Sequence, residues 1–272
     1  DEAAGIDPTT PPLSRVALTR LTDTRVQIVW TFHHLLLDGW SLPLVMADLF
    51  TAYRQQPLPT RPPFRNHLAW LARQDTQAAH THWQNVLDGY DTPVPLPYDR
   101  TPDDPRTARS TERVEWVPPA EFSEALHVFA RRRRITLNTV VQGAWALLLA
   151  AHSGRTDIVF GATTSGRPAD QPDAEHTIGI YINTLPVRTT IDPTTTVTHW
   201  LHTLQNQQTE ARRHDHLPLT HIHHHTPLPT DTPLFDSLVV FENYPVDENT
   251  ARTHHLTVHD ITANEATNYP LT

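Results

Sequence analysis

Apolar and polar residues alternate along two neighbouring stretches near the start of the chain. Residues 15–21 (RVALTRL) and 25–34 (RVQIVWTFHH) share this period of two, and only the residues TDT separate them. Alternation is typical of a strand, because successive side chains point to opposite faces, and a short polar link favours a hairpin. The pattern therefore predicts an antiparallel hairpin with His33 and His34 at the end of its second strand.

Helical spacing follows the hairpin and returns several times along the chain. Apolar residues that recur every three to four positions predict one helix face turned toward a core. Helices are expected over residues 42–53, 66–89, 119–134, 136–154 and 196–213. The second of these would end at Gly89, and the fourth, apolar on nearly all sides, is predicted to be buried and to end at Gly154.

Further strand patterns lie between the helices. Strands are expected over residues 111–117, 157–163, 183–191, 235–243 and 255–261. The Pro-rich stretch over residues 92–105 is the best candidate for a linker, because its composition favours neither helix nor sheet. Mixed strands and helices around a central linker predict two α/β lobes.

Composition excludes several classes of function. The formal charge of −9 argues against general nucleic-acid binding, and the absence of cysteine excludes a disulfide framework, a thiol nucleophile and a cysteine-based zinc site. The longest apolar run, AWALLLAA, is far shorter than the roughly 20 residues of a membrane span, and no signal-peptide pattern is present. We therefore expect a cytoplasmic protein that binds neither nucleic acid nor a membrane.

The segment TFHHLLLDGWS holds the main candidate chemistry. An imidazole can accept a proton near neutral pH, and alternation along a strand would turn one of His33 and His34 toward a cleft and the other toward the core. Asp38 could hold the turn through an arginine or backbone amides, and Gly39 permits a tight turn and close approach of substrate. A purely structural pair of histidines is an equally good interpretation of these residues alone.

Three other stretches have competing interpretations. Residues 214–225 (HDHLPLTHIHHH) could bind zinc, but they lack HExxH spacing, and we expect most of these histidines to face solvent. Residues 131–134 (RRRR) would end a helix and complement its dipole, or bind an acidic partner or a phosphate. Asn183 interrupts an apolar strand and therefore needs hydrogen-bond partners, either in a structural network or at a substrate.

Several motifs occur in one order along the whole chain. They are FHHLLLDGWS, FRNHLAWLARQ, HWQNVLDG with LPYDRTP, SGRP with IGIYINTLPVR, HDHLPL, PLFDSLVVFENYP and TNYPLT. Together they resemble the condensation domain of nonribosomal peptide synthetases. The resemblance implies an α/β (α+β sandwich) fold of the two-lobed chloramphenicol-acetyltransferase-like type, with the active site in a tunnel between the lobes.

The same resemblance implies where the lobes lie. Residues 1–98 would be the remainder of an N-terminal lobe that carries HHxxxDG, residues 99–109 a Pro-rich linker, and residues 110–272 a C-terminal lobe truncated at its end. The family has more chain before HHxxxDG and after TNYPLT, so we expect an internal piece of a condensation domain with an incomplete N-terminal lobe.

The resemblance also assigns roles at the site. His34 would act as a base or a positioning group on the α-amine of the acceptor, while His33 and Asp38 would be mainly structural, Asp38 through an ion pair. Gly39 would keep space for substrate. The residues expected to line the tunnel or position substrate are Trp40, Ser41, Asn183 and Arg167. No metal is expected.

The implied reaction joins two carrier-bound substrates. A donor acyl or peptidyl thioester would react with an aminoacyl acceptor, and phosphopantetheine arms of donor and acceptor carrier domains would deliver both, so that no cofactor binds directly. A neighbouring adenylation domain is a further expected partner. Both histidines are present, unlike in heterocyclising relatives, and the INTLPVR and FENYP forms are those of condensing and not epimerising relatives. The segment HHLLLDGWSLP resembles most the type that joins an L-donor to an L-acceptor, so we expect that stereochemistry.

Two alternatives stay open. The chain could be an inactive fragment or a carrier-docking platform without catalysis, because part of the N-terminal lobe is expected to be missing. A metal-dependent hydrolase built on the histidines of residues 214–225 ranks well below both.

Overall fold

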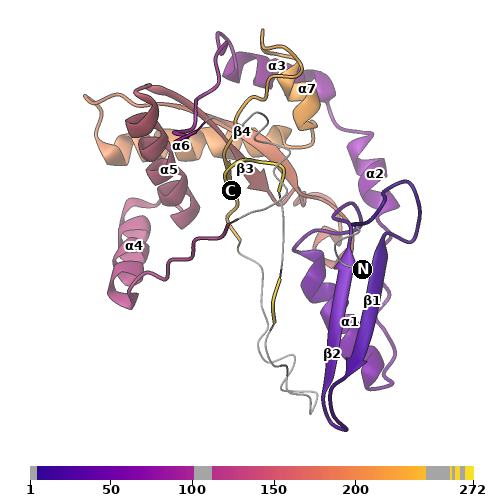
Figure 1. Cartoon of the computed structure of the whole chain (residues 1–272). Helices are drawn as coiled ribbons and strands as arrows, with labels where there is room; N and C mark the ends of the chain where they lie inside the picture. The colour runs from indigo at the N-terminus through magenta and orange to yellow at the C-terminus, as the bar shows by residue number, and fades with distance from the viewer. Residues whose placement is uncertain (1–4, 101–111, 243–257, 259–260, 264–266) are drawn as a thin grey trace. The chain divides into compact units, whose positions relative to one another are not determined.

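The structure is a computed structural model that describes residues 5–100, 112–242, 258, 261–263 and 267–272 (Figure 1). The chain divides into two compact units that interleave along the sequence. The first unit contains residues 5–73 and 167–182, and the second contains residues 74–100, 112–166 and 183–242.

The first unit contains the predicted hairpin. Strands β1 (Ser14–Arg20) and β2 (Val26–Phe32) pair antiparallel, with Ser14 opposite Phe32, which confirms the prediction from alternation. Helix α1 (Ser41–Tyr53) follows the turn that contains His33 and His34 (the histidine turn), as expected. Helix α2 (Arg65–Leu71) lies further along the sequence. The segment 167–182 adds the short 3-10 helix η2 (Ala174–His176).

The second unit is built on a three-stranded sheet. Its strand order is β4 (Asn183–Thr190), β3 (Asp157–Thr164), β5 (Leu238–Val239). Strand β3 pairs antiparallel with β4, beside which it lies in Figure 1, and parallel with β5. The strands expected over 157–163 and 183–191 are confirmed. The strand expected over 235–243 has only two paired residues.

Helices of the second unit pack on both faces of this sheet. Helices α5 (Leu137–Ser153) and α6 (Val197–Ala211) pack on β3 and β4, and α4 (Ala120–Arg133) packs on α5. Helices α3 (Thr76–Val86) and α7 (Leu219–His223) pack together, and the 3-10 helix η3 (Arg212–His214) follows α6.

Strand β3 joins the two layers of the core. Ile158 and Phe160 belong to one buried cluster, and Val159 belongs to the other, because adjacent side chains of a strand point to opposite faces. The cluster with Phe160 includes residues of α5 and α6, and the cluster with Val159 includes residues of α3 and α7.

The single helix predicted over residues 66–89 is wrong. Two helices, α2 and α3, replace it, and they belong to different units. The break falls before Asp75, whose side chain accepts a hydrogen bond from the backbone N–H of Ala78 at 2.9 Å and so begins α3. An aspartate cap satisfies backbone donors at a helix start, and here it outweighs the continuous apolar spacing.

Four further predictions have different outcomes. The strand expected over 111–117 is wrong for residues 112–117, which have no strand pairing among the described residues. The strand expected over 255–261 and the linker over 99–109 fall mostly outside the described residues. Helix α5 ends at Gly154, which has a φ of 68°, as predicted, but its exposed side includes Leu147 and Leu148.

The division into lobes at residues 1–98, 99–109 and 110–272 stays a prediction. In the part of the chain that the structure describes, no single helix is long and apolar enough to cross a membrane. Helices α4 and α5 pass that test only as a pair, and they are bent by 105° at the break between them.

Candidate functional site

The two histidines lie in the turn that follows β2. The strand ends at Phe32, so alternation alone does not decide which way His33 and His34 point, and the expected split between core and cleft stays a prediction. The ring Nδ1 of His33 accepts a hydrogen bond from the backbone N–H of Leu35 at 3.1 Å, and its backbone N–H donates to the carbonyl of Leu13 at 2.9 Å. His33 therefore shapes the turn.

His34 differs from His33 in its surroundings. Its side chain is exposed, and it has no hydrogen-bond or ion-pair partner among the described residues. An imidazole without such partners is available to a substrate, but only the backbone of the turn fixes its position.

Asp38 anchors the end of this turn in the interior of the first unit. One carboxylate oxygen, Oδ1, accepts hydrogen bonds from Arg167 Nη2 at 2.9 Å and from the backbone N–H of Ser41 at 2.9 Å. The other, Oδ2, accepts from the backbone N–H of Tyr181 at 3.0 Å. The side chain of Asp38 is fully buried and that of Arg167 is 8% exposed, so the expected ion pair at Asp38 is present and lies away from water.

Ser41 connects the same turn to the segment around Gly179. Its hydroxyl lies 2.8 Å from Asp38 Oδ1 and 2.9 Å from the carbonyl oxygen of Gly179, and it accepts from the backbone N–H of Gly179 at 3.1 Å. The backbone N–H of Asp38 also donates to the Gly179 carbonyl at 3.2 Å. The buried hydroxyl of Ser41 therefore holds the start of α1 against the segment 167–182.

The guanidinium of Arg167 has further partners within the first unit. It donates to the carbonyl oxygens of Thr177, at 3.0 Å, and of Ala174, and it stacks over the ring of Tyr181 at 4.3 Å. These contacts give Arg167 a role in holding the turn, and its expected role in positioning substrate stays a prediction.

Gly39 and Trp40 lie between Asp38 and the first residue of α1. Gly39 is half-buried, and the described glycines with positive φ do not include it, so the turn does not use the left-handed freedom of glycine there. Trp40 is half-buried and occupies the position before the first residue of α1. Their expected contacts with substrate stay predictions.

Sequence reasoning missed a row of hydrogen-bonded side chains that begins at Tyr181. Gln171 Nε2 donates to the hydroxyl of Tyr181 at 3.2 Å, and Gln171 Oε1 lies 3.0 Å from His67 Nδ1. His67 is 5% exposed, and burial lowers the pKa of its imidazole, which favours the neutral form. The FRNHLAWLARQ and IGIYIN motifs contain His67 and Tyr181, but no spacing rule links either residue to Gln171.

Asn183 belongs to the second unit, at the start of β4. Its side-chain Nδ2 donates to the carbonyl oxygens of Asp215 and Leu217, each at 2.8 Å, and its Oδ1 accepts from the backbone N–H of Thr184 at 2.8 Å. The amide therefore has the structural partners that a buried amide needs. Its expected place in a tunnel near His34 stays a prediction, because the two residues lie in different units.

The loop that Asn183 holds carries a perturbed carboxyl group. Burial raises the pKa of Asp215 to about 6, and the hydrogen bond from Thr164 Oγ1 to Asp215 Oδ2, at 3.0 Å, opposes this shift only in part. Asp215 is thus the described carboxyl group whose charge is most disfavoured by its surroundings.

The histidine-rich stretch is less exposed than predicted. Four of its six histidines are half-buried: His214, His216, His223 and His225. His225 Nε2 lies 2.7 Å from His80 Nδ1, and the rings of His214 and His82 stack at 4.5 Å. Among the described residues, no group of three or more histidines and carboxylates is arranged to hold a metal ion.

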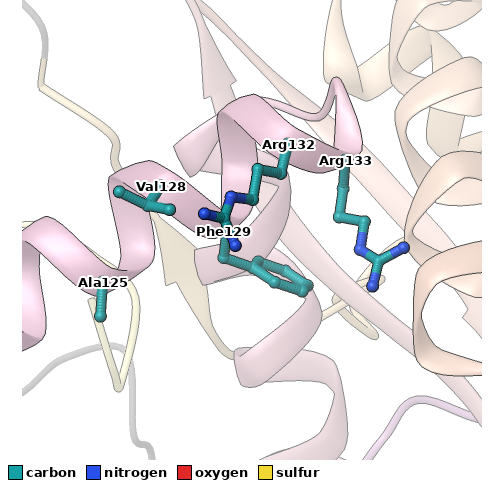
Figure 2. Close-up of a pocket in the computed structure, with 5 residues that line it drawn as sticks. All are labelled: Ala125, Val128, Phe129, Arg132 and Arg133. Carbon is teal, nitrogen blue, oxygen red and sulfur yellow. The ribbon is translucent and has the colours of Figure 1, made fainter.

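The arginine run ends α4 as predicted. Figure 2 shows a pocket lined by side chains of this one helix, among them Phe129, Arg132 and Arg133. Arg131 pairs with Glu124 at 3.1 Å, and both side chains are exposed. Arginines at the end of a helix complement its dipole, which agrees with the first interpretation. The alternative, binding of an acidic partner or a phosphate, stays a prediction.

Comparisons with known proteins agree with the fold. The family model described as Condensation domain matches residues 1–272. One of the linear gramicidin synthase proteins of Brevibacillus parabrevis is 43% identical over 97% of this chain, which spans 4% of that protein's length. The chondramide synthase of Chondromyces crocatus is 39% identical over 100% of this chain, which spans 7% of its length.

Two solved structures are also similar. The X-domain from teicoplanin biosynthesis, in a complex with OxyB, gives a TM-score of 0.70 at 27% identity and covers 86% of this chain and 55% of its own. The first condensation domain of the calcium-dependent antibiotic synthetase gives 0.56 at 22% identity, covering 76% of this chain and 49% of its own, and supports the fold alone.

These matches define an α/β protein of the chloramphenicol-acetyltransferase-like class, which confirms the predicted fold class. The chain belongs to the condensation domain family, which confirms the resemblance found in its motifs. Condensation domains of nonribosomal peptide synthetases are acyltransferase-type domains that form peptide bonds between carrier-bound substrates.

Proposed function

We propose that this chain catalyses amide-bond formation between a carrier-bound acyl or peptidyl thioester and the α-amine of a carrier-bound aminoacyl acceptor, both of L-configuration. The α-amine nitrogen attacks the thioester carbonyl carbon. A C–N bond forms, the C–S bond breaks, the donor thiol leaves, and the nitrogen loses one proton.

The observation that carries this proposal is the turn between β2 and α1. His34 is exposed to solvent on this turn, while Asp38, Ser41 and Arg167 hold the end of the turn inside the first unit. Such a design provides an exposed proton acceptor on a fixed backbone. General-base assistance contributes about 10²–10⁴-fold, and orientation of two reactants can supply about 7–11 kcal/mol.

His34 has two distinct chemical tasks in this proposal. A free α-amine has a pKa near ~8, so a fraction is already neutral at neutral pH without a base. His34 accepts the proton that the amine loses as the C–N bond forms, and it orients the amine by accepting a hydrogen bond. Asp38 and His33 act through the turn and do not touch substrate.

The partners follow from the same reaction. The donor and acceptor carrier domains deliver the two substrates on phosphopantetheine arms, and an adenylation domain loads the acceptor. The chain itself then needs no cofactor for the step, because the thioester already supplies the activated carbonyl.

The direct test uses the polypeptide that carries this chain with a donor carrier and an acceptor carrier, each loaded with a defined aminoacyl group. Intact-protein mass spectrometry should show the acceptor carrier gaining the donor acyl mass. A donor of D-configuration is the matched control and should react more slowly. Absence of product with every loaded pair would contradict the proposal, and preference for the D-donor would contradict its stereochemical part.

A docking platform without catalysis is the second candidate. The similar X-domain from teicoplanin biosynthesis forms a complex with OxyB, so a chain of this fold can bind a partner protein. In this case the carrier domains would bind the chain without any transfer of the acyl group. Measurable carrier binding with no product in the same assay would favour this second function.

A further inference from the structure

We propose that His67 is a positioning residue for the histidine turn: its buried imidazole holds Gln171 and Tyr181, and through them the carboxylate of Asp38. The inference rests on the proposed function, because the turn matters only if His34 acts on substrate. It goes beyond the HHxxxDG motif, because His67 lies on α2, 29 positions after Asp38.

The hydrogen bonds that link His67, Gln171 and Tyr181 have a defined direction. Because Gln171 Nε2 donates to the hydroxyl of Tyr181 at 3.2 Å, Gln171 Oε1 faces His67 and can only accept. The Nδ1 of His67, 3.0 Å away, therefore carries the proton. Tyr181 then donates its own backbone N–H to Asp38 Oδ2 at 3.0 Å.

Packing fixes the same residues. The ring of His67 contacts the ring of Tyr181 with centroids 4.1 Å apart, and the guanidinium of Arg167 lies 4.3 Å from the centroid of the same Tyr181 ring. His67, Gln171 and Tyr181 are all buried, at 5%, 7% and 4% exposure. Buried polar groups with few alternatives hold one arrangement, since losing a partner leaves a desolvated group unpaired.

The consequence for the site follows from the surroundings of His34. Its imidazole has no partner of its own among the described residues, so its position depends on the backbone between His33 and Asp38. His33 fixes one end of that backbone and Asp38 the other. If the hydrogen bond from Tyr181 to Asp38 weakens, the backbone of the turn moves and the imidazole of His34 moves with it. A displacement of about 1 Å can reduce a rate about 100-fold.

Two variants separate the N–H of His67 from its ring. His67→Phe keeps an aromatic ring against Tyr181 and removes the donor, whereas His67→Asn removes the ring and keeps an N–H near the position of Nδ1. His176→Phe is the control, because that histidine lies in the same unit, has a side chain 60% exposed and takes no part in the chain of bonds.

The first measurement does not depend on activity. Amide hydrogen exchange at Tyr181 should become about 10-fold faster in His67→Phe and stay close to wild type in His67→Asn and His176→Phe. If His67→Phe does not fold, Gln171→Met breaks the same link from its other side and should give the same result. Unchanged exchange at Tyr181 in the folded variants would overturn the inference.

The second measurement uses amide formation by the polypeptide that carries this chain. His67→Phe should lower kcat by about 10- to 100-fold and leave the KM for the acceptor carrier near its wild-type value, and His67→Asn should restore most of kcat. If wild type forms no amide, the proposed function fails, and the exchange result still decides the inference. If wild type is active and His67→Phe is equally active, the inference alone fails.

Discussion

At the scale of single residues, the ion pair of Asp38 and Arg167 decides how the histidine turn is held. The sequence predicts that Asp38 needs an arginine or backbone amides, and the structure supplies both. The sequence could not predict which arginine pairs with Asp38, because Arg167 lies 129 positions away and each arginine of the chain is an equal candidate by spacing. The amide of Asn183 shows the same limit: its need for partners was predictable, but its carbonyl acceptors were not.

Replacing the buried carboxylate of this pair should be costly. Asp38→Asn leaves the Arg167 guanidinium, 8% exposed, without its counter-charge, and we expect a loss of about 3–5 kcal/mol in the free energy of unfolding. Asp23→Asn is the matched control, because Asp23 and its partner Arg20 are 96% and 69% exposed, and it should cost less than about 1 kcal/mol. Urea denaturation measures both, and equal losses would show that the buried pair does not support the fold.

Asp215 predicts a pH dependence of stability. Its pKa is raised from a usual value near ~4 to about 6, so the folded state binds a proton more tightly than the unfolded state does. The contribution of this group is therefore most favourable below about pH 4 and is lost as pH rises through about 6. The free energy of unfolding of wild type, relative to Asp215→Asn, should fall by about 2 kcal/mol over this range.

Urea denaturation at several pH values gives this difference, and carbon NMR of the Asp215 carboxyl group gives its pKa directly. Parallel pH profiles of the two proteins, or a carboxyl group that titrates near pH 4, would contradict the assignment.

At the scale of elements, local signals predicted strands and helix ends better than helix continuity. The hairpin of β1 and β2 follows from alternation, and Gly154 ends α5 as its conformational freedom predicts. The break between α2 and α3 was missed because apolar spacing continues across it, while Asp75 begins a new helix by capping Ala78. Pairing of β5 with β3 needs residues more than 70 positions apart, which no local pattern reveals.

The tightest contact on the central strand gives a test of packing. A methyl group on Gly161 of β3 would overlap the ring of Phe235, which is 2% exposed. We expect Gly161→Ala to lower the free energy of unfolding by about 1–3 kcal/mol. Because the two residues share one space, Phe235→Leu should cost less in the Gly161→Ala background than in wild type, and strictly additive losses in a double-mutant cycle would contradict this contact.

At the scale of the whole molecule, the order of the motifs along the chain predicts the family, and the family model confirms it. The family model covers residues 1–272, and the chain accounts for 4% of the length of the gramicidin synthase relative. The fold class follows from that membership, and the reaction type of the family supports the proposed function. The arrangement inside the first unit does not, because a motif names the residues of the turn but not the buried side chains that hold it.

Two kinds of residue meet at the turn between β2 and α1. His34 is exposed and free of side-chain partners among the described residues, whereas Asp38, Ser41 and Arg167 are committed to one another. This separation predicts that changes at His34 affect the reaction more than the stability, and that changes at Asp38 affect both.

The most direct test of the catalytic role of this turn is the rate of amide formation by the polypeptide that carries this chain, with loaded donor and acceptor carriers, for wild type and His34→Ala. We expect His34→Ala to fold with a free energy of unfolding close to that of wild type and to lower the rate by about 10²–10⁴-fold. His176→Ala, which changes an exposed histidine of the same unit, should keep the wild-type rate. A folded His34→Ala variant that forms amide at the wild-type rate would contradict the role assigned to the turn.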